Sequence, residues 1–375
     1  MFTPDRPALA YMAACVAYVH DAEVGAPLVR KALDALPDEQ GANIFCALAT
    51  ARLLGTDFSP GEDPTTQPSG ELREALAQAL VRWYPQLAGT SAQFTPFLFS
   101  IVFSALEDTN VEQRIRMLEG ELAAARTGQR GNAQMQMFFG YGRSESVIAP
   151  LQLPSMLPDF PAHVAALFSD DTNISIMGFG EAHIDDLANN LDQVHDPVLK
   201  VLLARAAHDT AAAAQAVEPL LASEQPSLTA YLLAAGIAAE ADDFTRAVRL
   251  LETARYLPMQ SSLRQQVDGA IVAYGQEVDG DEALLASARA AALRLRRAPL
   301  QPDDRMALSS ALDALGLAEE AEQEAEQVAQ SNLTASSGSS GGFMPQGGTD
   351  RAEELIASGK RPQAVREIAR YYEQC

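Results

Sequence analysis

Cysteine is scarce in this chain of 375 residues, and its three cysteines follow no recognisable spacing. Cys15 and Cys46 lie in apolar stretches, and Cys375 is the last residue. This arrangement predicts neither a zinc site nor a framework of disulfides. We expect Cys15 and Cys46 to pack as small apolar side chains.

Long apolar runs are also missing. The chain has no stretch of about 18 apolar residues, the length that a membrane-spanning helix needs. Residues 1–7 lack a basic start, and no small-residue cleavage pattern follows them, so no signal peptide is predicted. We expect the sequence to be a segment of a longer protein and to reside in the cytoplasm.

Positive charge is in short supply. The chain has 27 Lys and Arg against 50 Asp and Glu, for a formal net charge of −23, and only Lys31, Lys200 and Lys360 are lysines. Such a surface repels phosphate backbones and anionic membranes, which argues against nucleic acids and membranes as partners. The expected partner is a protein or peptide, and a basic segment would complement the acidic surface.

Aromatic residues make up only 6% of the chain, whereas hydrophobic residues make up 47%. Alanine supplies much of this hydrophobic fraction. It is the strongest helix former, and its small side chain lets helices approach closely. The composition therefore favours helix pairs stacked in a row over one deep core.

The clearest helix pair lies between Tyr231 and Ala254, where two helical patterns meet at the acidic turn Asp242-Asp243. The pattern resembles the tetratricopeptide repeat. Tyr231 stands where that family prefers Trp, and Pro258 stands where it ends the pair. Ala234 and Ala235 stand where the family prefers Leu-Gly, and Ala238 replaces its usual Tyr. The packing positions of the second helix are occupied by Phe244, Ala247, Leu251 and Ala254.

Related pairs recur along the chain, with matching alanines at Ala213, Ala247, Ala283 and Ala321, which are 34, 36 and 38 residues apart. Gly25 occupies the family's close-contact position in an N-terminal pair. The resemblance implies an all-α, right-handed superhelical solenoid of stacked antiparallel helix pairs, with a protein-binding role. The helices expected around these alanines cover residues 197–207, 210–221, 267–274, 282–293, 306–315 and 318–328.

We expect five parts. They are irregular N-terminal helical repeats (1–127), an apolar strap rich in Pro and Gly with short helices (128–195), a tetratricopeptide-like array (196–330), a flexible Ser/Gly linker (331–348) and a terminal helix pair (349–375). Residues 55–70 are expected to form a surface loop, and residues 94–105 a buried helix.

The strap contains the candidate partner-binding residues Phe138, Phe139 and Tyr141. Methionine and aromatic side chains are enriched at adaptable binding surfaces, and Met135 and Met137 precede these three. The alternative is that all five fill the protein's own groove or seal a gap between helices.

The sequence gives only weak indications of catalytic or metal-binding residues. Glu181, His183 and Asp186 could approach one cation, but they match no known ligand motif, and Asp185 and Asp186 suit the first turn of a helix. No nucleotide-binding loop or catalytic triad is recognisable. We therefore predict no catalysis, no metal and no cofactor.

Two charged runs have alternative interpretations. Residues 294–297 contain three arginines that are expected to pair with acidic neighbours near a helix C-terminus, the alternative being a phosphate site. Residues 319–326 are acidic and are expected to form a solvated helix face, the alternative being a groove for a basic peptide.

The predicted function is a non-enzymatic scaffold that binds a peptide or helix of a partner in a concave acidic surface. One alternative is a regulatory or accessory region of a larger enzyme whose catalytic domain lies outside this segment. Another is a small-molecule or metal sensor that uses residues 181–186.

Overall fold

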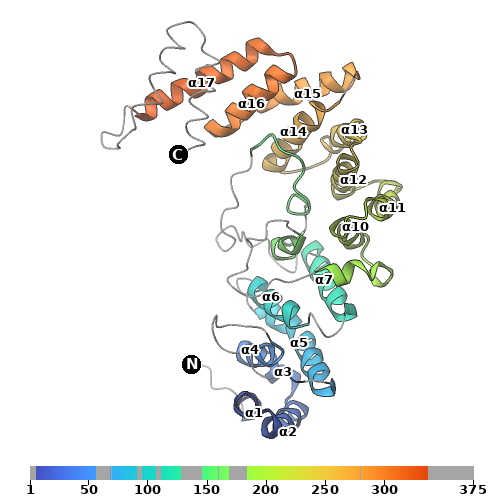
Figure 1. Ribbon diagram of the computed structural model, residues 1–375, viewed down its shortest axis with the longest axis vertical. Coiled ribbons are helices and arrows are strands. Elements are labelled where there is room, and N and C mark those ends of the chain that lie inside the picture. Colours follow the sequence, from blue (N-terminus) through green and yellow to red (C-terminus); the bar gives the residue numbers. More distant parts are fainter. Residues whose placement is uncertain are drawn as a thin grey trace. The chain divides into compact units, whose positions relative to one another are not determined.

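The structure, a computed structural model, describes residues 6–55, 68, 70–90, 95–106, 111–127, 146–158, 160–168, 184–278 and 280–336 (Figure 1). Every regular element in these residues is helical, and none is a strand. The prediction of an all-α fold is confirmed. The chain divides into an N-terminal unit, Met1–Gly142 with Gln152–Gln225, and a C-terminal unit, Arg143–Leu151 with Pro226–Cys375.

Helices that are neighbours in sequence pack as pairs in both units. The α-helices described in the N-terminal unit are α1 (Arg6–His20), α2 (Ala22–Asp34), α3 (Asp38–Gly41), α4 (Ile44–Leu53), α5 (Gly70–Thr90), α6 (Thr95–Ala105), α7 (Val111–Arg126), α8 (Ala162–Ala165), α9 (Asp185–Ala188), α10 (Pro197–Ala206) and α11 (Thr210–Leu221). Those described in the C-terminal unit are α12 (Leu228–Glu240), α13 (Phe244–Ala254), α14 (Ser261–Gly275), α15 (Glu282–Leu295), α16 (Pro302–Ala314) and α17 (Ala318–Ser336).

Two glycines set the distance between paired helices. A Cβ atom added at Gly25 in α2 would lie 2.2 Å from the Cα atom of Tyr18 in α1. A Cβ atom added at Gly275 in α14 would lie 2.4 Å from the Cβ atom of Ala288 in α15. Side chains do not fit at such distances, so the helices of each pair touch through their backbones and smallest residues. The close contact predicted at Gly25 is confirmed.

Local side-chain chemistry closes the turns between paired helices. The carboxylates of Asp209 and Asp243 each accept the backbone N–H three residues on, which caps α11 and α13. The residues before them, His208 and Asp242, have φ angles of 55° and 59°, and Gly316 has a φ of 79°. This left-handed conformation ends the preceding helix. The turn predicted at Asp242-Asp243 is confirmed, and the other two positions lie between the helices predicted at 197–207 and 210–221 and at 306–315 and 318–328.

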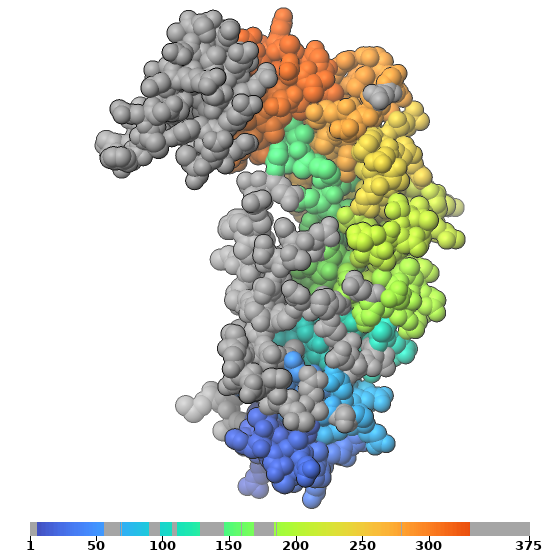
Figure 2. Space-filling model, in the orientation of Figure 1, coloured from blue at the N-terminus to red at the C-terminus, as the bar shows by residue number. Residues whose placement is uncertain are grey.

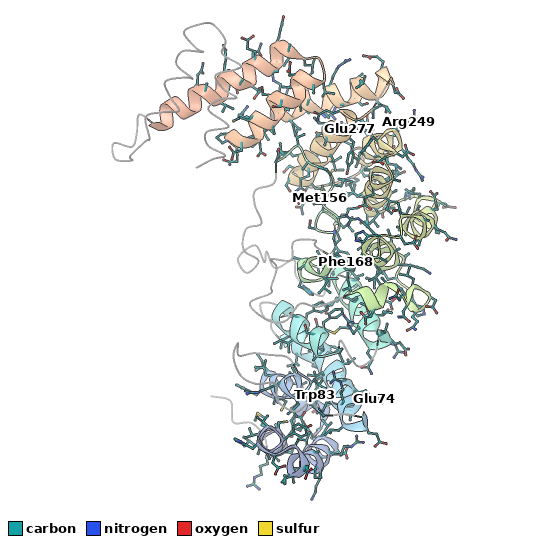
Figure 3. All side chains as sticks on the ribbon, viewed as in Figure 1. Glu74, Trp83, Met156, Phe168, Arg249 and Glu277 are labelled. Carbon is teal, nitrogen blue, oxygen red and sulfur yellow. The ribbon has the colours of Figure 1, made fainter. Side chains whose placement is uncertain are left out.

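The core of the first helices is aromatic. Trp83 in α5 is fully buried, meets the ring of Tyr11 edge-on at 5.9 Å, and donates its indole N–H to Asp38 at 3.2 Å (labelled in Figure 3). The buried helix predicted at residues 94–105 is α6, and its described side chains from Leu98 to Phe103 are buried. None of the helices in the described ranges combines the length and apolar character that a membrane span requires.

Cys15 and Cys46 are buried and unoxidised, as expected of small core residues. Burial raises the pKa of the Cys15 thiol to about 12 and also raises the pKa of Cys46. Because the thiolate is the reactive form, both cysteines are inert structural residues at neutral pH.

Helix α7 carries two buried charged residues that tie other helices to it. Glu121 is 1% exposed, accepts the hydroxyl of Tyr84 in α5 at 2.6 Å, and lies 3.0 Å from Nε2 of His163 in α8. Two turns earlier, the fully buried Arg114 donates to Asp186 in α9 at 2.6 Å. These bonds attach the short helices α8 and α9, of four residues each, to α7.

Some predicted segments end differently from the sequence pattern or lie outside the described residues. Helix α17 continues to Ser336, six residues into the segment predicted as a linker. The rest of that linker, the predicted terminal helix pair at 349–375 and most of the predicted loop at 55–70 are outside the described residues.

The substitution Gly25→Ala is expected to destabilise the protein by about 1–3 kcal/mol, because the new methyl group would collide with the backbone of α1. Gly120→Ala in α7 is the matched control. Its Cβ would meet nothing within 4 Å, so a gain of about 0.5–1 kcal/mol from helix propensity is expected. Urea unfolding of both variants measures the difference, and equal effects would contradict the close contact.

The substitution Glu121→Ala is expected to cost about 3–5 kcal/mol, because it leaves buried polar groups of Tyr84 and His163 without their carboxylate. Glu74→Ala in α5 removes an exposed carboxylate and should change the free energy of unfolding by less than about 0.5 kcal/mol. Chemical unfolding compares the two, and a small effect at Glu121 would refute its structural role.

Candidate polypeptide-binding face of the C-terminal unit

The C-terminal unit holds a short extended stretch of its own chain against its helices. Residues Ser146–Leu151, which we call the docked segment, form no helix and lie on α14 and α16 (Figure 1). In Figure 2 the green atoms of this part of the chain lie against the orange atoms of the C-terminal unit. The docked segment belongs to the region that the sequence predicts as a strap.

Main-chain N–H groups fix the docked segment at its two ends. The N–H of Val147 donates to the carboxylate of Asp304 in α16 at 2.6 Å. The N–H of Leu151 donates to the hydroxyl of Tyr274 in α14 at 2.8 Å, and the Leu151 side chain is buried. Backbone donors are common to all residues except proline, so this recognition depends little on side-chain identity at either end.

Gly269 in α14 lets the docked segment approach the helix backbone. A Cβ atom at this position would lie 1.7 Å from the carbonyl oxygen of Val147. No other residue type fits without displacing the segment. Together Gly269, Tyr274 and Asp304 form what we call the docking face.

The docking face is built on a rigid support. The ring of Tyr274 is 5% exposed and packs against the ring of Phe244 in α13, with centroids 6.0 Å apart. Asp304 lies in the first turn of α16. The hydroxyl and the carboxylate that receive the docked segment are therefore held by helices and not by loops.

The chain leaves the C-terminal unit directly after Leu151. In the N-terminal unit, Arg205 of α10 donates to the carbonyl oxygen of Leu153 at 2.9 Å.

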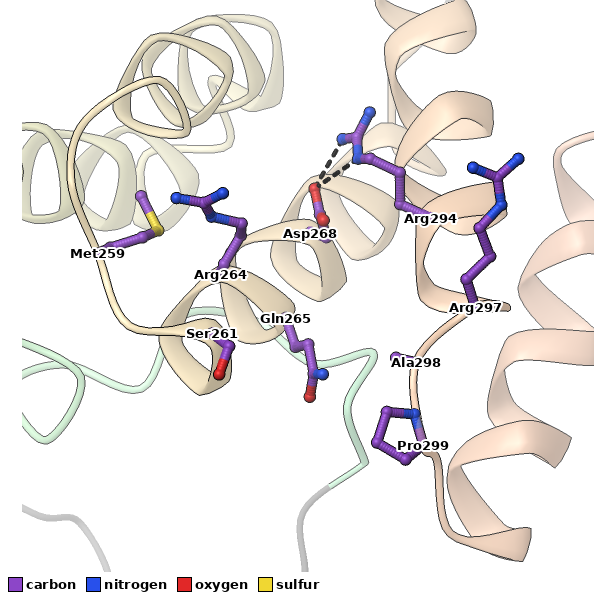
Figure 4. Close-up of a pocket in the computed structure, with 9 residues that line it drawn as sticks. All are labelled: Met259, Ser261, Arg264, Gln265, Asp268, Arg294, Arg297, Ala298 and Pro299. Atoms are coloured by element: carbon purple, nitrogen blue, oxygen red, sulfur yellow. Dashed lines mark hydrogen bonds and ion pairs between the residues drawn. The ribbon is translucent and has the colours of Figure 1, made fainter.

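A cleft of about 410 Å³ opens in the C-terminal unit beside the first half of α14. Its walls come from α14 and the loop before it, from the end of α15 and from the loop that follows α15 (Figure 4). The residues that line it are Met259, Ser261, Arg264, Gln265, Asp268, Arg294, Arg297, Ala298 and Pro299. Gln265 is one helical turn before Gly269, so the cleft and the docking face share α14.

A buried carboxylate organises the arginines around the cleft. Asp268 is 5% exposed, and its Oδ1 atom accepts from Arg255 at 2.9 Å and from Arg294 at 2.6 and 3.1 Å. The predicted pairing of the arginine run with acidic neighbours is confirmed for Arg294. It is also confirmed for Arg296, which donates to Glu324 at 3.0 Å.

Glu324 departs from the predicted solvated face. It is 1% exposed, and besides Arg296 it accepts from Arg305 in α16 at 2.7 Å. The helical period turns Glu324, with Ala321 and Val328, toward the other helices, while Glu319 and Glu322 stay exposed. The acidic run at residues 319–326 is therefore partly exposed and partly buried in ion pairs with arginines.

The described residues contain no group of three His, Cys, Asp or Glu side chains suited to a metal ion, and of the three candidate ligands only Asp186 is among these residues. Asp186 pairs with Arg114 in the first turn of α9, as its helix-start pattern predicts for a structural residue. Glu181 and His183 lie outside the described residues, as do the partner-binding candidates Phe138, Phe139 and Tyr141.

The docking-face residues do not stand out in the sequence. One signal is Gly269, a glycine inside a helical pattern, which costs about 1 kcal/mol relative to alanine and so indicates a packing reason. The carboxylate of Asp304 lies 157 residues from Val147 in sequence, and no local pattern connects the two.

Comparison of the chain with protein-family models, with curated proteins and with solved structures finds no match.

The substitution Gly269→Ala is expected to release the docked segment while leaving α14 helical, because the added methyl group would overlap the carbonyl oxygen of Val147. Hydrogen exchange at the N–H groups of Val147 and Leu151 should become much faster than in the wild-type chain. Gly120→Ala provides the control for a glycine in a helix with open space around it. Unchanged protection in the Gly269 variant would show that the segment is held by other contacts.

Proposed function

We propose that the protein is a non-enzymatic interaction scaffold that binds an extended polypeptide segment of a partner on the docking face. The observation that carries this proposal is the docked segment, which is an extended polypeptide already bound there. A face that accepts one strand through main-chain N–H groups suits another of similar shape.

The proposed architecture is a tetratricopeptide-like α-solenoid. Within the C-terminal unit, α13 contacts α14, and α15 contacts α16, so successive helix pairs are packed against each other. The docked segment lies on α14 and α16, which are both first helices of their pairs. Repeat arrays of this type use an extended surface built from several successive repeats to bind partners, and the docking face, which spans two pairs, fits that description.

The docked segment would act as a built-in competitor for the partner. A tethered segment has an effective concentration of about millimolar for its own site, which a partner in solution has to exceed or displace. Affinity for a partner therefore depends on how firmly the docked segment is held. Because the chain has a net charge of −23, the partner segment is predicted to be basic.

The test frees the docking face without altering it. In the full chain, Val147→Pro combined with Leu151→Pro removes the two N–H donors of the docked segment and leaves Gly269, Tyr274 and Asp304 intact. A fluorescein-labelled peptide with the sequence of residues 146–152 then probes the vacated face by fluorescence polarisation.

The double-proline variant is expected to bind this peptide at least about tenfold more tightly than the wild-type chain, since its own competitor is weakened. Adding Gly269→Ala to the double variant should abolish binding, because the methyl group blocks the face. Circular dichroism confirms that each variant keeps its helices. If the folded double variant fails to bind the peptide, the docking face is not an exchangeable site.

A further inference from the structure

The solvent side of α1 is apolar between its two ends. Its exposed residues recur at helical spacing and form one line, which we call the α1 stripe: Arg6, Leu9, Ala10, Ala13, Val16 and His20. Leu9 is 48% exposed and Val16 is 57% exposed. The opposite side of α1 is buried, and the helix packs on α2 and α4 (Figure 1). The α1 stripe is therefore a second apolar face on a helix that already has a buried one.

Exposed apolar side chains concentrate in the helix pair of α1 and α2. In the part of the chain that the structure describes, the large apolar side chains that remain exposed are Leu9, Val16, Val24, Leu28, Phe45 and Tyr256. The first four belong to α1 and α2. Single exposed apolar residues need no explanation, whereas a cluster of them is typical of an interaction surface.

The α1 stripe carries no negative charge. Helix α1 contains no Asp or Glu, whereas the whole chain has 50 of them against 27 Lys and Arg. Two copies of a chain with a net charge of −23 repel each other, most strongly where acidic side chains approach within about 8 Å. A basic partner would find no acidic side chain on α1, so this surface suits a second copy of the chain instead.

The α1 stripe is complementary to itself when two copies cross antiparallel. Its middle residue is Ala13, through which a two-fold axis can pass. This crossing sets Leu9 against Ala17 of the second copy. It likewise sets Ala10 against Val16 of the second copy. Large side chains then meet small ones, and Ala13 meets itself, so the two helices can pack closely.

The charges at the ends of the stripe favour the antiparallel arrangement. In that crossing Arg6 of one copy lies at the end of α1 in the other copy, where the exposed acidic residues Asp21 and Glu23 follow His20. A parallel crossing would set Arg6 against Arg6 and Asp21 against Asp21. Opposite charges therefore meet in the antiparallel arrangement, and like charges meet in the parallel one.

We propose that the protein forms a homodimer in which the α1 stripes of two copies pack antiparallel about a two-fold axis at Ala13. The α1 stripe is separate from the docking face, so the dimer does not depend on the proposed function. A contact made mainly by one helix is at the small end of specific interfaces, and a dissociation constant of about 10 μM is expected.

Sedimentation velocity of the full chain tests the association. The wild-type chain is expected to be mostly dimeric at about 100 μM and mostly monomeric at about 1 μM. Ala13→Glu should weaken dimerisation at least about a hundredfold, because it places two carboxylates at the axis. Ala286→Glu in α15 also adds a carboxylate at an exposed alanine within a helix and should leave the dimer unchanged. Circular dichroism verifies that both variants keep their helices.

Disulfide cross-linking in a Cys375→Ser background tests the arrangement of the two helices. Ala13→Cys is expected to form a disulfide between two copies under mild oxidation, because residue 13 meets itself at the axis. Leu9→Cys should not cross-link, because the two copies of residue 9 lie about 12 Å apart along the helices, beyond the reach of a disulfide.

Three results would count against the dimer as proposed. A wild-type chain that stays monomeric at about 100 μM overturns it and leaves the α1 stripe to a partner of another kind. A dimer that survives Ala13→Glu is formed by another surface. Equal cross-linking at residues 9 and 13 contradicts the antiparallel arrangement.

Discussion

Close backbone approach is the constraint on which the described structure depends. At Gly25 and Gly275 it brings the helices of a pair so near that a single methyl group does not fit. At Gly269 the same device brings an extended segment against a helix. Glycine costs helix stability wherever it occurs inside a helix, so its use at these positions indicates that contact outweighs propensity. Helix pairing and segment binding thus follow from one physical principle, namely the removal of side chains where backbones meet.

Buried charged residues are a second source of contacts between the helices and the segments around them. Glu121, Asp268 and Glu324 are each nearly or fully buried, and each binds side chains from two other elements. Arginine suits this role because its planar group can donate from several nitrogens at once. The scarcity of lysine in the sequence accords with such use. The negative net charge is therefore partly internal and does not describe the surface alone.

Features that depend on residues close together in the sequence could be predicted from it. The turns at Asp242 and Gly316 follow from capping and left-handed conformations, and the helix class follows from alanine content and period. The start of α14 at Ser261 differs from the predicted start at residue 267, because residues 261–266 show no apolar period. The location of the docked segment cannot be predicted from the sequence, for another reason. Its location depends on partners such as Asp304 that are far away along the chain, and only folding brings them together.

Asp304 has one further consequence. It lies in the first turn of α16, whose preceding residue Gln301 provides no side-chain cap. When the N–H of Val147 leaves, the carboxylate remains next to the positive end of that helix and faces water, so it is not left as an isolated buried anion. The electrostatic cost of emptying the site is therefore limited, which is what the proposed exchange of the docked segment for a partner requires.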